Sequence, residues 1–232
     1  MKHAFRLGLL VTLALILSAC GVSGAQHQQA QAKGRPLPAY ERAVLPAGQY
    51  YTTEFEPSLS FRIAGDDWRF DGPSTALGDP EHPDYLFVET SDLDAEIAFF
   101  NLRKLQGIQK PRGPAGETEP VPAPDELFGW FRRHPYLETS KLEPVTVGGV
   151  KGVQFDVVTD LPKLSDKTGV DTFKLSTGGF AGIYYLKKER FIVLKDVKGV
   201  PVVIQYGQEK DEIDEFVPMA KKVLKSIEWT GS

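Results

Sequence analysis

The sequence predicts an α+β domain in which an antiparallel β-sheet has helices packed on its faces. Three observations predict this fold class. Short apolar segments with the pattern of strands follow one another across hairpin-length turns. A helix is expected to begin in the middle of the chain, after a proline-rich stretch. Near the end, apolar residues at helical spacing predict a strongly amphipathic helix.

The first strands are expected between residues 59 and 102. Leu59, Phe61 and Ile63 alternate with polar residues, which is the period-2 pattern of a half-buried strand. Beyond a turn after Ile63, apolar segments at 68–70, 85–88 and 95–102 continue the pattern.

The first helix is expected to start at Pro124. Residues 107–124 hold five prolines, which oppose a helix and central-strand pairing. Pro124 suits a first helical turn, and Asp125 and Glu126 complement the positive end of the helix dipole. Pro135 sets the end. The apolar side is expected to come from Leu127, Phe128, Phe131 and Tyr136.

The rest of the domain is expected to be a hairpin, a long loop, a meander and the last helix. The hairpin joins 145–147 to 153–158, and residues 160–180 form a polar, irregular loop of the length that tends to be functional or mobile. The meander covers 183–186, 191–196 and 200–206. The last helix buries Ile213, Phe216, Val217, Ala220, Val223, Leu224 and Ile227, with Pro218 kinking it or starting a second segment.

The N-terminal residues predict a lipoprotein signal. Lys2 and Arg6 precede an uncharged run, residues 7–19, that is too short to span a bilayer as a stable helix. The run ends Leu-Ser-Ala-Cys, which resembles the lipobox of bacterial lipoproteins and makes Cys20 the lipidated first residue of the mature protein. The alternative is an ordinary cleaved signal with an incidental cysteine. Cys20 is the single cysteine of the chain, so it has no disulfide partner there.

These features divide the chain into three parts. Residues 1–19 are the signal peptide, residues 20–49 are the lipidated cysteine and a flexible tether, and residues 50–232 are a single α+β domain. Lipid on Cys20 would anchor the protein to a membrane of the cell envelope, on the extracytoplasmic side. The membrane and leaflet are left open.

The charge of the mature protein excludes two kinds of partner. The chain has 27 basic and 31 acidic residues; removing residues 1–19 takes away Lys2 and Arg6 and leaves 25 against 31, a net charge of −6. Such a surface argues against nucleic acid, which requires a basic face. It also argues against electrostatic adhesion to anionic lipid, so the acyl chains are expected to hold the protein at the membrane.

Several segments resemble a known family. In order they are 127–135 (LFGWFRRHP), 144–150 (PVTVGGV), 153–157 (VQFDV), 190–194 (RFIVL), 197–199 (VKG), 202–204 (VVI), 214–216 (DEF) and 223–229 (VLKSIEW). This order resembles uncharacterised exported bacterial proteins whose domain is similar to the Mog1/PsbP-like (LpqN-type) α/β/α sandwich. The resemblance covers about residues 50–229. It implies a binding or assembly module and supplies no catalytic signature.

Histidines and acidic residues offer weak metal sites. His82 lies among acidic residues of one turn, but it has no second histidine at helical spacing, so a solvated turn is favoured. His134 precedes Pro135, where a helix cap is the expected role. Asp92, Asp94 and Glu96 suit a hard cation, yet they do not follow the EF-hand pattern. We expect a solvated acidic edge and no metal; whether the acidic segment 79–96 or the loop 160–180 forms a site is left open.

Basic and aromatic residues give a second set of candidates. A basic group in the late meander suits an acidic partner or a phosphate-bearing polymer, although exposed lysines are the default; it comprises Lys187, Lys188, Arg190, Lys195 and Lys198. Tyrosines of the same region suit a pocket wall or plain packing: Tyr184, Tyr185 and Tyr206. The tryptophans are expected to pack at the core: Trp68, Trp130 and Trp229.

The sequence favours a binding protein over an enzyme. It contains no Gly-x-Ser-x-Gly elbow and no phosphate-cradling glycine loop, and acylation would consume its thiol. We expect no cofactor and no catalytic residue. The expected function is that of an extracytoplasmic lipoprotein whose domain binds an envelope protein or a small molecule. The alternatives are an accessory or structural lipoprotein of an envelope complex and, less favoured, an envelope hydrolase.

Overall fold

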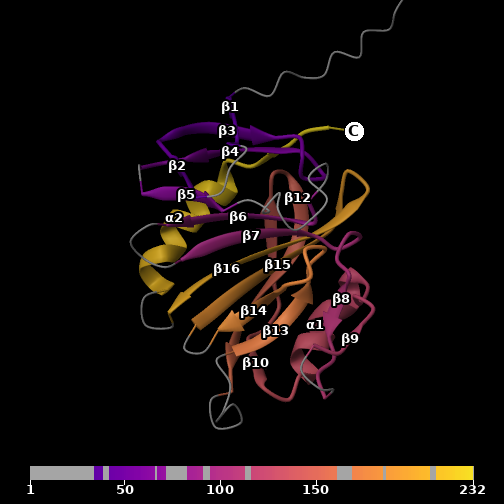
Figure 1. The fold of residues 1–232 in the computed structure, drawn as a ribbon. Helices are drawn as coiled ribbons and strands as arrows, with labels where there is room; N and C mark the ends of the chain where they lie inside the picture. The colour runs from indigo at the N-terminus through magenta and orange to yellow at the C-terminus, as the bar shows by residue number, and fades with distance from the viewer. Residues whose placement is uncertain are drawn as a thin grey trace, which may run out of the picture.

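The computed structural model describes residues 34–38, 42–65, 67–71, 83–90, 95–112, 116–160, 169–184, 187–209 and 213–231 (Figure 1). Cys20 and the signal predicted for residues 1–19 lie outside these residues. Neither helix of the described part is long and apolar enough to cross a membrane.

The main sheet has nine strands, and its neighbouring strands are antiparallel. Across the sheet they are β10 (Leu137–Thr139), β12 (Val150–Thr159), β15 (Lys187–Val197), β16 (Val200–Glu209), β7 (Glu96–Asn101), β6 (Tyr85–Thr90), β5 (Trp68–Asp71) and β2 (Ala43–Leu45). The ninth, β11 (Glu143–Val147), also pairs with β12.

Two four-stranded sheets flank the main sheet. The N-terminal sheet has the order β1 (Arg35–Pro36), β3 (Gly48–Thr52), β4 (Leu59–Ile63) and β17 (Glu228–Trp229), and its pair β1–β3 is parallel. The lower sheet of Figure 1 has the order β14 (Phe180–Tyr184), β13 (Gly169–Lys174), β8 (Gly107–Gln109) and β9 (Thr118–Glu119). Within the described residues there are two helices, α1 (Pro124–Arg133) and α2 (Ile213–Lys225).

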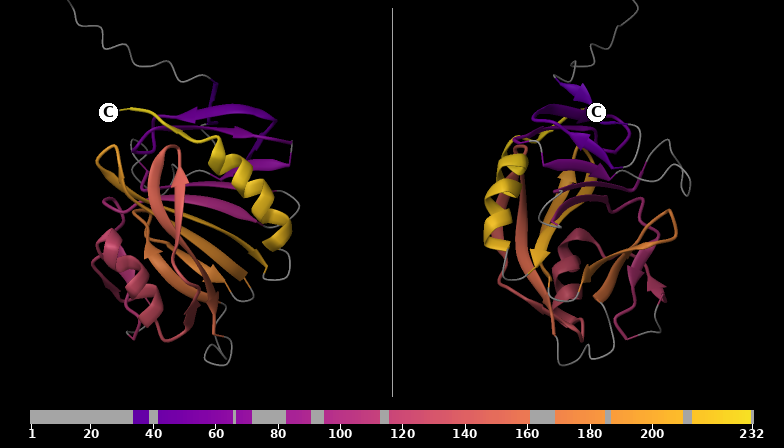
Figure 2. Two further views of the ribbon diagram at one scale, coloured as in Figure 1. Left: turned by 180° about the vertical axis from the view of Figure 1, so that it is seen from behind. Right: turned by 60° about the vertical axis from the view of Figure 1, so that its left-hand side comes forward.

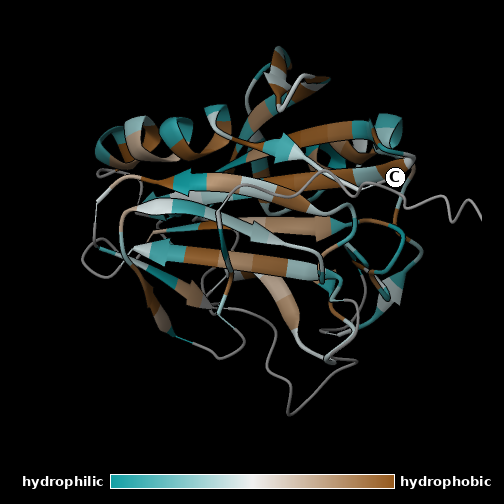
Figure 3. Cartoon of the chain, turned by 90° about the horizontal axis from the view of Figure 1, so that it is seen from above, coloured by the Kyte–Doolittle hydropathy of each residue, from teal (hydrophilic) through white to brown (hydrophobic). Residues whose placement is uncertain are grey.

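Successive side chains of a strand point to opposite faces of a sheet, so the hydrophobic core is divided between the two faces of the main sheet. On β15, Ile192 and Leu194 pack in one buried cluster with α2 and the N-terminal sheet. Phe191 and Val193 pack in a second cluster with α1 and the lower sheet. Each face is therefore covered by one helix and one small sheet (Figure 2). Hydrophobic residues run along the central strands in Figure 3, as this division requires.

The antiparallel sheet and the two helices are confirmed. The helices cover less of each face than a plain α/β/α sandwich implies, because the small sheets cover the rest. Helix α1 starts at Pro124 and ends before Pro135, as expected. Helix α2 runs through Pro218 as one helix, so the alternative of a second segment starting there is wrong.

Two boundary predictions are wrong. The tether was expected to reach residue 49, but Ala43 and Leu45 are buried in β2 and β3 begins at Gly48, so the folded part starts earlier. The loop expected at 160–180 is a hairpin over much of its described part, because β13 begins at Gly169 and pairs with β14. Strands β8 and β9 also lie in the proline-rich stretch, at positions free of proline.

The turn between β11 and β12 is shaped by the C-terminal strand. Gly148 has φ +56°, and a Cβ there would meet the ring of Trp229 at 2.5 Å. The Trp229 indole N–H donates a hydrogen bond to the Val147 carbonyl at 3.1 Å. The turn glycine thus serves close packing as well as backbone conformation.

Candidate functional site

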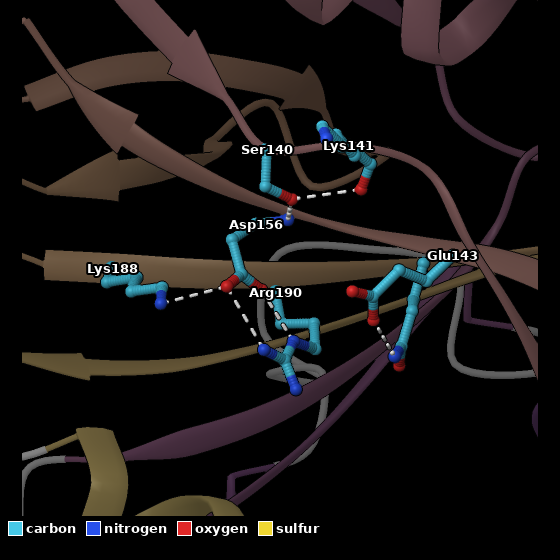
Figure 4. Close-up of polar contacts among 7 residues, drawn as sticks. Ser140, Lys141, Glu143, Asp156, Lys188 and Arg190 are labelled. Carbon is cyan, nitrogen blue, oxygen red and sulfur yellow. Dashed lines mark hydrogen bonds and ion pairs between the residues drawn. The ribbon is translucent and has the colours of Figure 1, made fainter.

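An ion-pair cluster joins two neighbouring strands of the main sheet (Figure 4). Asp156 on β12 lies directly opposite Arg190 on β15. Arg190 Nε donates to Asp156 Oδ1 and Nη2 to Oδ2 at 3.0 Å, while Lys188 Nζ lies 2.8 Å from Oδ2. Burial alone would raise the pKa of Asp156, but the hydrogen bonds from Arg190 and Lys188 hold it below its ordinary value.

Hydrogen bonds beside this cluster join the segment between β10 and β11 to β12. Strands β10 and β11 both pair with β12, and the chain between them leaves the ladder. There the Ser140 N–H donates to the Asp156 carbonyl at 2.9 Å, and the Asp156 N–H donates to Ser140 Oγ at 2.8 Å. The Ser140 hydroxyl donates to the Lys141 carbonyl. Through these bonds Ser140 fastens the segment between β10 and β11 to β12.

The basic residues of the late meander do not gather into one patch. Lys188 and Arg190 point to one face of β15, and Lys187 points to the other, where it lies over the Tyr184 ring. Lys195 forms an ion pair with Asp125 of α1. Lys198 stands in the exposed turn before β16. The single basic surface that the sequence suggested is therefore not formed.

Glu189 is a buried acid that the sequence did not single out. Its side chain is fully buried, and Gly207 lies opposite it on β16. A Cβ on residue 207 would collide with Glu189 Oε2, so the glycine makes room for the carboxyl group. Among the described residues, neither carboxyl oxygen has a hydrogen-bond partner, nor has Oε1 of the buried Gln205.

The surroundings of Glu189 favour its neutral form. Gly207 also lies opposite Glu96 of β7, so the two acids flank one glycine across three strands. Burial raises the pKa of Glu189 to about 8; the charge of Glu96 adds to this rise, while the charge of Lys187 opposes it. A protonated carboxyl can donate the hydrogen bond that these buried acceptors lack.

The two segments left open by the sequence meet in the structure. Asp84, from the acidic segment 79–96, is buried and accepts hydrogen bonds from Ser176 N at 2.7 Å and Ser176 Oγ at 2.8 Å. Ser176 lies in the turn between β13 and β14. This contact fixes the turn against β6. Residues His82, Asp92 and Asp94 lie outside the described residues.

The remaining candidates are packing residues. His134 is the C-cap of α1, as predicted, and its Nδ1 accepts a hydrogen bond from Tyr136 N at 3.3 Å. All three tryptophans are buried, which confirms their packing role: Trp68, Trp130 and Trp229.

The tyrosines of the late meander do not share a pocket wall, because Tyr206 is buried beside α2 and Tyr184 is exposed on β14. Tyr185 lies outside the described residues. Within the described part, no group of histidine, cysteine and acidic residues is placed to hold a metal.

A cavity of about 480 Å³ opens beside the edge strand β9. It lies between the turn that follows β7 and the stretch that leads into α1, and its lining is Leu102, Leu105, Gln106, Thr118, Glu119, Pro120 and Val121. Gln106 Nε2 donates to the Ser176 carbonyl at 3.2 Å, which ties the cavity to the β13–β14 turn. The Trp130 indole N–H donates to Glu119 Oε1 at 2.8 Å. No sequence pattern marked this cavity, because its walls come from segments that carry no periodic signal.

Comparison with known proteins gives two similar structures. No protein-family model and no curated protein sequence matches the chain. LpqN, involved in cell envelope biogenesis of Mycobacterium tuberculosis, is 12% identical over 82% of this chain and 91% of that chain, with a TM-score of 0.35. Cyanobacterial PsbP (CyanoP) from Synechocystis sp. PCC 6803 is 10% identical over 82% of this chain and 94% of that chain, with a TM-score of 0.38. Both are of the Mog1/PsbP-like or LpqN-type kind that the sequence resembles.

Proposed function

We propose that this protein is a lipid-anchored, extracytoplasmic protein of the cell envelope whose domain binds a small ligand in the cavity beside β9. The cavity carries the proposal. Its volume of about 480 Å³ is large enough for a small molecule, and it is an open hollow whose accessible wall is more polar than apolar.

The placement of the cavity suits an anchored receptor. Strand β1, the first described element after Cys20, lies at one end of the molecule, and β8, β9 and α1 lie at the other (Figure 1). Lipid on Cys20 would therefore hold the protein by the end away from the cavity. Ligand would reach the cavity from the aqueous side.

The lining favours binding over catalysis. Glu119 is the one carboxylate among the seven lining residues, which include no histidine and no cysteine. General acid–base chemistry requires a positioned acid and a positioned base, and hydrolysis by paired carboxylates requires two. We therefore propose a binding protein without a cofactor.

An accessory protein that docks through an apolar patch has less support. Among the described residues, the large hydrophobic side chains that are exposed lie on separate elements: Val44 on β2, Leu142 before β11 and Tyr184 on β14. These residues do not form one contiguous apolar patch of the kind that marks a protein–protein interface.

Replacing Cys20 by Ala is expected to release the protein from the membrane without unfolding the domain. The acyl chains would be lost, and the acidic mature chain offers little electrostatic hold on anionic lipid. Membrane and soluble fractions, compared by immunoblot with signal cleavage verified, measure the effect. Cys20→Ala protein that is processed and still sediments with the membrane would contradict the anchor.

Replacing Val121 by Phe is expected to abolish binding of a compact apolar probe in the cavity, because the larger side chain occupies its space. Cyclohexanol titrated into the ¹⁵N-labelled full-length chain should shift the indole N–H signal of Trp130, which bonds to the lining residue Glu119. The three tryptophans give three such signals, and a Trp130→Phe variant assigns this one.

Val145→Phe is the matched control, since Val145 is also half-buried but lies on β11, away from the cavity. It should bind cyclohexanol like the unaltered chain. Equal binding by Val121→Phe and the unaltered chain, or no shift of the Trp130 signal in either, would reject the cavity as the site.

A further inference from the structure

Resting on the proposed function, we infer that the cavity beside β9 selects small ligands that carry a positive charge, with Glu119 as the partner of that charge. Glu119 is the single charged residue of the lining. Gln106 and Thr118 supply neutral polar groups, and the other lining residues are apolar: Leu102, Leu105, Pro120 and Val121. An anionic ligand would meet a like charge in this cavity and no basic side chain in its wall.

The carboxylate of Glu119 is held in place before a ligand arrives. Its strand β9 pairs with β8, where Glu119 lies opposite Ile108. The indole of Trp130, itself 4% exposed, donates to Oε1. The Trp130 ring packs against Phe131 and His134, with ring centroids 5.0 and 5.2 Å away. Because the partner group is already ordered, a ligand cation would not have to order it.

The hydrogen bond from Trp130 leaves Glu119 able to bind a cation. A carboxylate has about four acceptor sites, and the indole N–H uses one of them. The indole is neutral, so the negative charge of Glu119 is not cancelled by it. An ammonium group can then donate to the remaining acceptor sites as a charge-assisted hydrogen bond.

The basic residue after β8 does not neutralise this site. Lys110 Nζ lies 2.7 Å from Glu117 Oε1, outside the lining. The hydrogen bond to Glu117 is the main cause that raises the pKa of Lys110, and the charge of Glu119 adds a smaller part. One lysine thus faces two glutamates, and its hydrogen bond goes to Glu117 and not to Glu119.

The lining sets the second requirement of the ligand. Leu102 and Leu105 are buried and Val121 is half-buried, so most of the accessible wall is polar and the apolar contact it offers is small. The ligand class is therefore a small amine.

Three probes of equal shape and different charge test the inference: cyclohexylamine, cyclohexanol and cyclohexanecarboxylate. Each is titrated into the ¹⁵N-labelled full-length chain at neutral pH, and the Trp130 indole N–H signal reports binding. The amine is expected to bind about two- to fivefold more tightly than the alcohol, which corresponds to one ion pair at a partly exposed site. The carboxylate is expected to bind more weakly than the alcohol.

Glu119→Gln removes the charge and keeps an oxygen that can accept the Trp130 hydrogen bond. This variant should bind the amine no better than the alcohol and should bind the alcohol like the unaltered chain. Glu138→Gln is the matched control, since Glu138 is exposed on β10 and lies outside the lining, and it should keep the preference for the amine.

A failure of the charge selectivity can be distinguished from a failure of the proposed ligand-binding function. If the alcohol binds the unaltered chain as tightly as the amine, or if Glu119→Gln keeps the preference for the amine, the charge selectivity is overturned and the cavity stands. If no probe shifts the Trp130 signal, the proposed ligand-binding function itself is overturned.

Discussion

Replacing Glu189 by Gln is expected to stabilise the protein increasingly as the pH rises from about 4.5 to about 8. The pKa of Glu189 is about 8 in the folded chain, against an ordinary value of 4.5. Between these values the unfolded chain has lost this proton and the folded chain keeps it. The contribution of Glu189 to stability is therefore fully present below pH 4.5 and is lost as the pH rises toward 8, at a slope of about 1.4 kcal/mol per pH unit.

The glutamine variant separates this effect from that of other titrating groups. Its amide is close in size to the carboxyl group, so it fits the space above Gly207, and it supplies a donor for the buried acceptor Gln205 Oε1. Its free energy of unfolding should lack the slope that Glu189 causes. Urea unfolding at several pH values between 4.5 and 8.5, for both proteins, measures the difference between them.

Glu138→Gln is a suitable control, because Glu138 is exposed on β10. Its stability profile should run parallel to that of the unaltered chain. If the profile of Glu189→Gln also runs parallel to it, Glu189 does not hold a proton in the folded protein, and the burial argument is wrong.

Replacing Phe216 by Ala is expected to cost about 3–5 kcal/mol of unfolding free energy. Phe216 lies in α2 and is fully buried. Its ring centroid lies 6.1 Å from that of Trp68 and 6.4 Å from that of Tyr206. The substitution would therefore leave a cavity between α2 and two strands of the main sheet, and aromatic contacts would be lost with it.

Val217→Ala provides the comparison within the same helix. Val217 is half-buried at the edge of the same cluster, so its truncation should cost about 1 kcal/mol or less. Urea unfolding monitored by circular dichroism measures both variants. A Phe216→Ala protein as stable as Val217→Ala would show that α2 does not pack on the sheet as described.

The sequence predicts the parts of the fold that repeat a pattern over several residues. Helix α2 follows from helical spacing around Phe216, and β4 follows from the alternation of Leu59, Phe61 and Ile63. Strands β8 and β9 carry no such signal, because three and two residues are too short to show a period. For that reason the cavity beside β9 could not be predicted from the sequence.

Other features were missed because they depend on pairing between strands. Glu189 stands between basic residues, which makes its segment look solvated; its burial follows from facing Gly207 on the next strand. Asp156 and Arg190 are 34 residues apart and meet through strand register. Pairing of this kind is set by the whole sheet and not by local sequence.

The N-terminal sheet has a consequence for how the chain folds. Strand β17 pairs with β4, and beside them Arg62 N donates to Ser226 Oγ across 164 residues of sequence. Contacts of such sequence separation form late, since a long loop must close first. A chain still emerging from the ribosome therefore cannot complete this sheet before residues 226–229 are made. For a protein proposed to cross a membrane, the N-terminal sheet would therefore stay incomplete until the C-terminal residues are available.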